Sequence, residues 1–228
     1  LFANKRYVLN MIIHLQQVID KPTIDVINEK LAQHTFTDGK LSAGAGAKSV
    51  KNNQQLSVDQ KAQGLVDFTL QRMLRNPWVE AALRPKTIAR SMINRYQNEQ
   101  SYGVHVDDAL MNQARTDISF TLSLSALDEY QGGALTIEEH SGERSWRLDA
   151  GDVLIYPSHF LHQVEPVTAG QRTALVGWCQ SWVRDAQQRA LLFDMQQAVM
   201  QEFETQGRSE QYLLLSKSYQ NLLRMWMD

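Results

Sequence analysis

The segment Ile118-Ser119-Phe120-Thr121-Leu122-Ser123-Leu124 decides the fold class, because large apolar residues alternate in it with small polar ones. Successive side chains of a β-strand point to opposite faces, so this period of two predicts a strand. The same period continues through residues 85–184. We expect further strands at 135–138, 145–148, 153–156, 161–167 and 172–183, with turns at Gly132-Gly133, Ser141-Gly142, Ala150-Gly151 and Ala169-Gly170. About eight short strands indicate a β-sandwich or jelly roll.

Both flanks of this strand region have helical patterns. Asp20-Lys21-Pro22 is a typical helix start, and Ser57 with Gln60 three residues later predicts a second one. Residues 37–55, between these starts, are rich in Gly, Ala, Asn, Gln and Lys, which is typical of a loop. After residue 184 we expect two more helices, the last one capped by Ser209. The chain therefore divides into a helical support at 1–84, a strand core at 85–184 and a helical region at 185–228.

The composition is that of a globular protein and excludes several classes of partner. The chain has 228 residues, of which 43% are hydrophobic and 21% are charged, and its net charge is −2. It is therefore neither disordered nor collagen-like, and it has no charge excess that would hold nucleic acid or a membrane surface. Apolar runs are far too short to span a bilayer. The single cysteine, Cys179, allows no disulfide within the chain, so we expect a reducing, cytoplasmic compartment.

The strongest chemical signal is His105-Val106-Asp107. In extended backbone, His105 and Asp107 point to the same face and can bind one ion, and His162 can complete the set from another strand. Two imidazoles and one carboxylate leave three positions open on a metal, as in non-haem Fe(II) oxygenases. Alone, the pair also fits a hydrogen-bonded surface pair. His159 is a rival to His162, but three residues separate them in a strand, so only one can face the ion.

Arg172, ten residues after His162, is a candidate ligand for a cosubstrate. Fe(II) oxygenases of this kind need a cation for the far carboxylate of 2-oxoglutarate, whose other end chelates the iron. A turn at Thr168–Gln171 would place Arg172 opposite Val167, within reach of the metal through the cosubstrate. Arg172 would also neutralise a site in which Fe²⁺, one carboxylate and the 2-oxoglutarate dianion leave a charge of −1. The alternative is a solvated turn residue, and these residues alone leave both interpretations open.

Together these motifs resemble the Fe(II)/2-oxoglutarate dioxygenases of the prolyl 4-hydroxylase type, most closely the bacterial PKHD-type hydroxylases of the iron-uptake factor group. The matching stretches are residues 38–44, 51–56, 95–96, 102–107, 132–133, 150–157 and 162–172. Their combination is far more specific than any one of them. The resemblance implies an α+β fold: a double-stranded β-helix (jelly roll) core with N-terminal helices and a C-terminal helical appendage.

The resemblance also implies roles for individual residues. It places iron on His105, Asp107 and His162, and 2-oxoglutarate on Arg172 and Tyr96, although Tyr96 is alternatively a core tyrosine. It implies Fe²⁺, O₂, 2-oxoglutarate as cosubstrate and L-ascorbate (vitamin C) as reductant. We expect residues 37–55 to be a mobile active-site loop. The expected contacts to substrate are Asn52, Asn53 and Tyr102.

The implied activity is hydroxylation of a C–H bond, coupled to decarboxylation of 2-oxoglutarate to succinate. Asp107 favours hydroxylation, because related halogenases leave the carboxylate position open for chloride. The substrate is a peptide or amino acid side chain or a siderophore-like molecule, with a link to iron homeostasis. Two other classes stay open: a non-catalytic metal-binding or sensing module, and a jelly-roll binder of sugars or peptides. We expect no nucleic acid or membrane partner, and the sequence leaves a homo-oligomer open.

Overall fold

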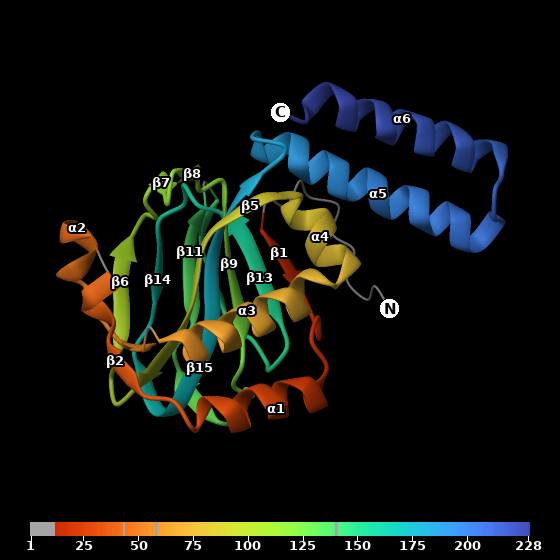
Figure 1. The fold of residues 1–228 in the computed structure, drawn as a ribbon. Helices are drawn as coiled ribbons and strands as arrows, with labels where there is room; N and C mark the ends of the chain where they lie inside the picture. The colour runs from red at the N-terminus through yellow and green to blue at the C-terminus, as the bar shows by residue number, and fades with distance from the viewer. Residues whose placement is uncertain (1–11, 43, 58, 140) are drawn as a thin grey trace.

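The computed structural model describes residues 12–42, 44–57, 59–139 and 141–228, and two antiparallel sheets dominate it (Figure 1). The large sheet has eight strands and the small sheet has five. In spatial order the large sheet contains β1 (Ile13–Leu15), β13 (Val153–Pro157), β9 (Ile118–Ser123), β15 (Val167–Ser181), β5 (Pro85–Gln97), β4 (Gln54–Leu56) and β2 (Phe36–Asp38), while β10 (Tyr130–Gly132) pairs with β15. The small sheet contains β12 (Gly142–Trp146), β11 (Leu135–Glu139), β14 (His162–Val164), β6 (Ser101–His105) and β3 (Lys51–Asn52).

The chain crosses between the two sheets at nearly every connection of the core. It runs from β5 in the large sheet to β6 in the small one, back to β9, and on through β11 and β12 to β13, β14 and β15. A separate hairpin of β7 (Leu110–Met111) and β8 (Ala114–Arg115) lies between β6 and β9 in the chain. This winding is that of a double-stranded β-helix and confirms the predicted jelly roll.

Three N-terminal helices cover the outer face of the large sheet: α1 (Lys21–Leu31), α3 (Gln60–Leu74) and α4 (Pro77–Leu83). Figure 1 shows α1 and α3 lying across this sheet. Asp20 caps α1, as the sequence predicts, by accepting a hydrogen bond from the Thr23 amide. The cap of α3 is Asp59 and not Ser57. The prediction was wrong because the Ser57 hydroxyl instead donates to the Thr35 carbonyl.

Residues 37–55 contain regular structure, which the loop prediction missed. Within them lie the end of β2, the 3₁₀ helix η1 (Gly39–Ser42), the short helix α2 (Ala45–Lys48), β3 and the start of β4. Strand β4 pairs with β5, and β3 pairs with β6, so this segment extends both sheets. The residue composition of this segment did not indicate the strands, because strands pair through backbone N–H and C=O groups, which every residue type except proline provides.

The predicted turn at Thr168–Gln171 is also wrong, because β15 runs through it without a break. Strand β10 pairs with this part of β15, and Gln131 lies opposite Ala169. Gly170 has a φ of +72°, and a Cβ there would overlap the Glu129 carbonyl oxygen. The glycine therefore permits a close approach of β15 to the backbone at Glu129, where the sequence predicted a turn.

The C-terminal region is a hairpin of two helices, α5 (Ala186–Gln206) and α6 (Glu210–Trp226), which projects from the jelly roll (Figure 1). Ser209 caps α6, as predicted. Leu192 and Tyr219 are buried between the helices together with Val183. Among the described residues, no helix is long and apolar enough to cross a membrane.

Candidate metal centre and cosubstrate pocket

The alternation that predicts β9 separates two buried environments. Ile118, Phe120 and Leu122 belong to the core between the large sheet and the helices. The intervening Ser119 and Thr121 are 2% and 4% exposed, and they line a pocket inside the jelly roll. The polar residues of the pattern therefore face the interior, where they are available for chemistry.

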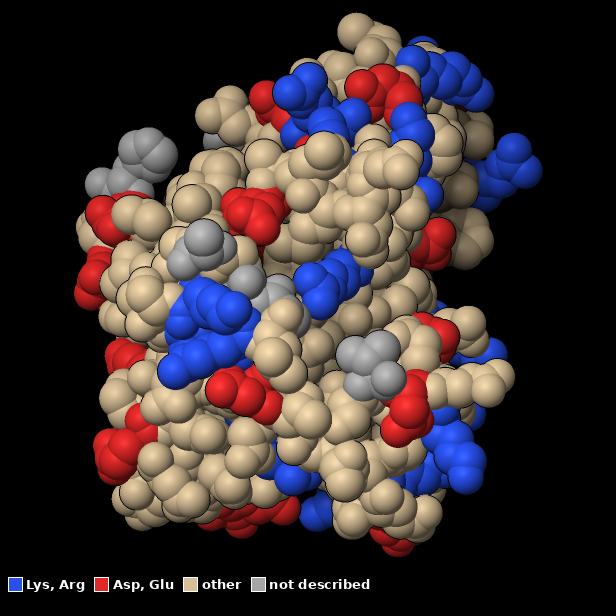
Figure 2. Space-filling view, turned by 60° about the vertical axis from the view of Figure 1, so that its left-hand side comes forward, with Lys and Arg blue, Asp and Glu red and all other residues tan. Residues whose placement is uncertain are grey.

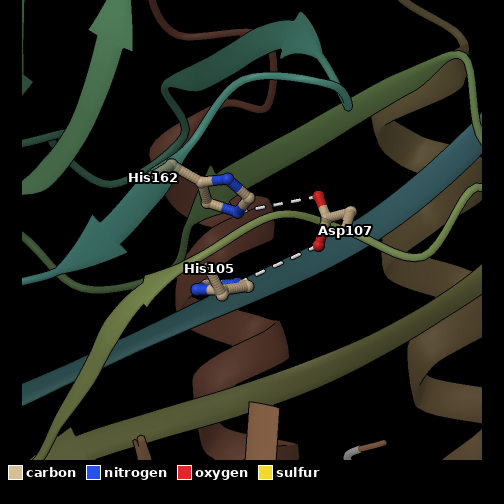
Figure 3. A group of neighbouring side chains, drawn as sticks. All are labelled: His105, Asp107 and His162. Atoms are coloured by element: carbon tan, nitrogen blue, oxygen red, sulfur yellow. Dashed lines mark ion pairs between the residues drawn. The ribbon is translucent and has the colours of Figure 1, made fainter. Parts of the chain in front are cut away.

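His105, Asp107 and His162 converge in this pocket (Figure 3). His105 ends β6, His162 begins β14, and the two are direct neighbours in the strand register, while Asp107 follows just after β6. Each residue offers one ligand atom, and the three atoms lie within 4.8 Å of one another. Nε2 of His105 is 3.9 Å from one Asp107 oxygen, and Nε2 of His162 is 3.6 Å from the other. These separations are longer than hydrogen bonds, and they suit an ion held among the three side chains.

Both imidazoles are held in the orientation that a metal needs. Nδ1 of His105 lies 2.9 Å from the Gly103 carbonyl oxygen, and Nδ1 of His162 lies 3.0 Å from that of Phe160. A carbonyl only accepts, so each Nδ1 carries the proton and each Nε2 presents a lone pair. Burial, together with the nearby His162, lowers the pKa of His105 to about 4, so its imidazole is neutral at physiological pH. A neutral imidazole is the form that binds a metal.

Ser119 and Ser158 position the carboxylate, and the sequence interpretation missed both. The Ser119 hydroxyl donates to Asp107 over 2.6 Å and lies 2.8 Å from the Ser158 hydroxyl. Because the carboxylate only accepts, Ser119 gives it its single proton, and Ser158 must then donate to Ser119. The only available signal was the serine on the polar side of the β9 alternation.

Arg172 and Tyr96 face each other across the β15 and β5 pairing. Arg172 is 4% exposed and Tyr96 is 2% exposed, and the guanidinium lies 5.5 Å from the centre of the Tyr96 ring. Arg172 forms no ion pair with any carboxylate among the described residues. Burial raises the pKa of Tyr96, so its hydroxyl stays protonated. A buried, unneutralised guanidinium is costly, and it fits the far carboxylate of a cosubstrate.

These groups line one pocket of about 890 Å³, counted with its open mouth. This volume is in the range of small-molecule sites. Tyr102 stacks on the His105 ring with centroids 3.6 Å apart, and burial raises the pKa of its phenol. The pocket therefore has room for more than the metal and its ligands.

The remaining predicted residues lie in different surroundings. Asn53 is 2% exposed, but neither it nor the exposed Asn52 lines the pocket. His159 is exposed, while His162 is buried in the cluster. The structure thus separates the two rival histidines, but not by the strand period: His159 lies in the turn after β13, and β14 begins only at His162.

Comparisons with known proteins agree with this architecture. Residues 91–180 match the 2OG-Fe(II) oxygenase superfamily, and residues 185–228 match the PKHD-type hydroxylase C-terminal domain. A PKHD-type hydroxylase of Idiomarina loihiensis is 50% identical over 218 residues, which are 96% of this chain and 100% of the relative.

Two solved structures have a similar fold. The first is a prolyl hydroxylase of Trichoplax adhaerens in complex with a hypoxia inducible factor peptide fragment. It has a TM-score of 0.59 and 11% identity, and the match covers 80% of this chain and 87% of that chain. The second is a prolyl-4-hydroxylase of Pseudomonas putida, with a TM-score of 0.56 and 17% identity over 75% of this chain and 92% of that chain. These likenesses concern the fold, and they confirm the predicted oxygenase-type jelly roll.

Proposed function

The chain belongs to the PKHD-type hydroxylases and is a 2-oxoglutarate-dependent dioxygenase, and from this we propose that it holds Fe²⁺ on His105, Asp107 and His162. The convergence of their three ligand atoms within 4.8 Å carries the assignment. Two imidazoles and one carboxylate are the donor set of non-haem Fe(II) oxygenases. The two carbonyl contacts that fix the Nε2 lone pairs support the same assignment.

We further propose that Arg172 and Tyr96 bind 2-oxoglutarate. The Arg172 guanidinium has forked donors that match a carboxylate, and burial excludes the water that would otherwise compete. The protonated Tyr96 hydroxyl, beside the guanidinium, is available to donate a hydrogen bond to the same carboxylate. Charge balance supports this placement, since the dianion neutralises both the metal centre and the arginine.

The division of labour in the site follows from these positions. Bound iron and 2-oxoglutarate supply the oxidation of a C–H bond by O₂, with succinate and CO₂ as the products of the cosubstrate. The protein keeps the His105 imidazole neutral, fixes Nδ1 of both histidines on backbone carbonyls, orients the Asp107 carboxylate through Ser119, and surrounds the centre with buried strands that limit water. Hydroxylation is the favoured outcome, because Asp107 occupies the carboxylate position.

The substrate we propose is a peptide or amino acid side chain or a siderophore-like small molecule, within a role in iron homeostasis. Ascorbate is the proposed reductant, and a reducing, cytoplasmic compartment fits the lone Cys179, which is fully buried. We retain Tyr102 as a substrate contact, because it lines the pocket beside His105. Asn52 lies in β3 and Asn53 follows it. We propose that these two residues affect substrate binding by positioning β3, and not by contacting the substrate in the pocket.

Slow succinate formation from 2-oxoglutarate, dependent on added Fe²⁺ and O₂, tests the proposal without a known substrate. The Arg172→Lys variant, which keeps the charge but loses the fork, should weaken the apparent affinity for 2-oxoglutarate by at least about tenfold and leave iron binding near normal. Equal loss of iron would show that Arg172 supports the fold. Iron binding without any succinate formation would favour a non-catalytic sensing module.

A further inference from the structure

Two further cations, Lys51 and Arg90, line the pocket that contains the metal ligands. Lys51 comes from β3 in the small sheet and Arg90 from β5 in the large sheet, so the two sheets converge here. Lys51 is 5% exposed, and its ammonium lies 5.4 Å from the centre of the Tyr102 ring. The Arg90 side chain makes no hydrogen bond or ion pair with any residue that the structure describes, although its backbone pairs with β15.

These two cations are close enough to repel each other. Burial lowers the pKa of Lys51 to about 8, and the charge of Arg90 contributes to the decrease, while Asp38 and Asp107 oppose it. Two like charges that face one pocket repel each other, and an anion bound between them would offset this repulsion. On the face that Figure 2 shows, groups of Lys and Arg lie among Asp and Glu.

The charged residues of the pocket indicate how much negative charge that anion carries. Three cations line it, namely Lys51, Arg90 and Arg172, against the two carboxylates of Asp107 and Asp108. Because the charges of Fe²⁺ and the 2-oxoglutarate dianion cancel, the side chains that line the loaded pocket keep one positive charge, while Asp38 acts on Lys51 from outside this lining. A carboxylate supplies the single negative charge that balances it, whereas a phosphate monoester would carry about −1.5 to −2.

We propose that Lys51 and Arg90 form a carboxylate-binding subsite for the substrate. The inference rests on the proposed function, and it adds the chemical class of the molecule that is hydroxylated. Two neighbouring polar atoms extend the class, because Oδ1 of Asn94 and Nε1 of Trp178 are buried without a hydrogen-bond partner in residues that line the pocket. An acceptor and a donor left unpaired are costly. A carboxylic acid that also carries an N–H group and a carbonyl, such as an N-acylated amino acid, has an anion for Lys51 and Arg90 and the matching donor and acceptor for Asn94 and Trp178.

Binding to a catalytically silent form tests this subsite. The protein is loaded with Zn²⁺ and 2-oxoglutarate, and ligand-observed NMR measures the affinity of three matched pairs of acid and amide. The pairs are N-acetyl-L-leucine, N-acetyl-L-proline and benzoic acid, each with its primary carboxamide. At least one acid should bind with a dissociation constant of about 1 mM or below and at least about tenfold more tightly than its amide. Lys51→Met and Arg90→Gln should each reduce this preference at least about threefold, and the double variant should abolish it.

Three controls separate this proposal from its alternatives. Lys48→Met removes an exposed charge from the neighbouring helix α2 and should leave the preference unchanged. Affinity for 2-oxoglutarate should be the same in wild type and both pocket variants, which also shows that they are folded. Wild-type protein that binds neither Zn²⁺ nor 2-oxoglutarate would contradict the proposed function instead.

Several results would overturn the carboxylate subsite. Equal binding of acid and amide would do so, as would a preference that survives in both pocket variants, or no acid binding at about 1 mM. Loss of 2-oxoglutarate affinity in Lys51→Met or Arg90→Gln would assign these cations to the cosubstrate. If Lys51→Met fails to fold, the half-exposed Arg90 still provides the test.

Discussion

The two faces of the large sheet use alternate residues of the same strands, yet they have opposite tasks. On β9, Ile118, Phe120 and Leu122 pack in the core shared with the helices, and that face also buries Leu175 and Cys179 of β15. The inner face presents Ser119 and Thr121 of β9, together with Arg172 of β15, to the pocket. The outer face contributes apolar burial and no chemistry. The inner face lowers the stability of the fold, because it buries polar groups that need hydrogen-bond partners.

This division predicts that stability and metal binding are separable in one strand. A substitution on the outer face should change the free energy of unfolding without changing the affinity for metal. A substitution on the inner face should do the reverse, because its hydrogen bonds serve the ligand set and contribute little apolar burial.

The largest expected effect comes from removing a ligand on the inner side. His162→Ala should abolish Fe²⁺ binding and succinate formation, because water does not restore the lost imidazole geometry. His159→Ala is the matched control: its side chain is exposed and should be dispensable for both. Metal content and succinate yield of the two purified variants decide the matter. Activity in His162→Ala but not in His159→Ala would reverse the ligand assignment.

A smaller effect is expected on the outer face. Leu122 is fully buried against the helices, and Leu122→Ala should lower the free energy of unfolding by about 2–5 kcal/mol. Chemical denaturation measures this change, and Fe²⁺ affinity of the folded protein should stay at the wild-type value. Val26→Ala on α1 is the control, because Val26 is 44% exposed and should cost less than about 0.5 kcal/mol. Weaker metal binding in Leu122→Ala would show that the two faces are coupled.

The fold was largely predictable because its strands have a strong period of two and its glycines mark most turns. The spacing of ten residues to Arg172 favours His162 over His159 as the third ligand, and the helix caps Asp20 and Ser209 were identifiable from residue type. The prediction of a turn at Ala169-Gly170 was wrong, because a glycine needed for close approach of two backbones cannot be told from a glycine in a turn by sequence alone. Strands β3 and β4 were not predicted, because their partners, β6 for β3 and β5 for β4, lie far away in the sequence.

The candidate site was predictable only in part. His105, Asp107 and His162 have the right types and spacing, but no local pattern shows that Lys51 and Arg90 enter the same pocket. Their proximity depends on the two sheets closing on each other. Likewise, period-two polar residues are usually placed toward solvent, whereas a jelly roll with helices on one sheet turns them toward its interior.

The smallest expected effect comes from Ser119, and it is the most direct test of the difference between the two faces of the large sheet. Its hydroxyl holds one Asp107 oxygen at 2.6 Å and is itself fixed by Ser158. Ser119→Ala should weaken Fe²⁺ affinity by about 10- to 100-fold, because the carboxylate is free to turn away from the ligand geometry. The free energy of unfolding should change by no more than about 1 kcal/mol, since the substitution removes no apolar packing.

Ser123→Ala provides the matched control for this prediction. Ser123 lies on the same strand, is equally buried and donates to the Ser125 carbonyl instead of to a ligand. It should therefore show a comparable change in stability with wild-type metal affinity. Ser158→Ala should give an intermediate loss of Fe²⁺ affinity. In this variant Ser119 still donates its hydrogen bond to Asp107, but it loses the hydrogen bond from Ser158 that orients its hydroxyl. If Ser119→Ala and Ser123→Ala weaken Fe²⁺ binding equally, the effect is general softening of the strand, and the Ser158–Ser119–Asp107 chain has no positioning role.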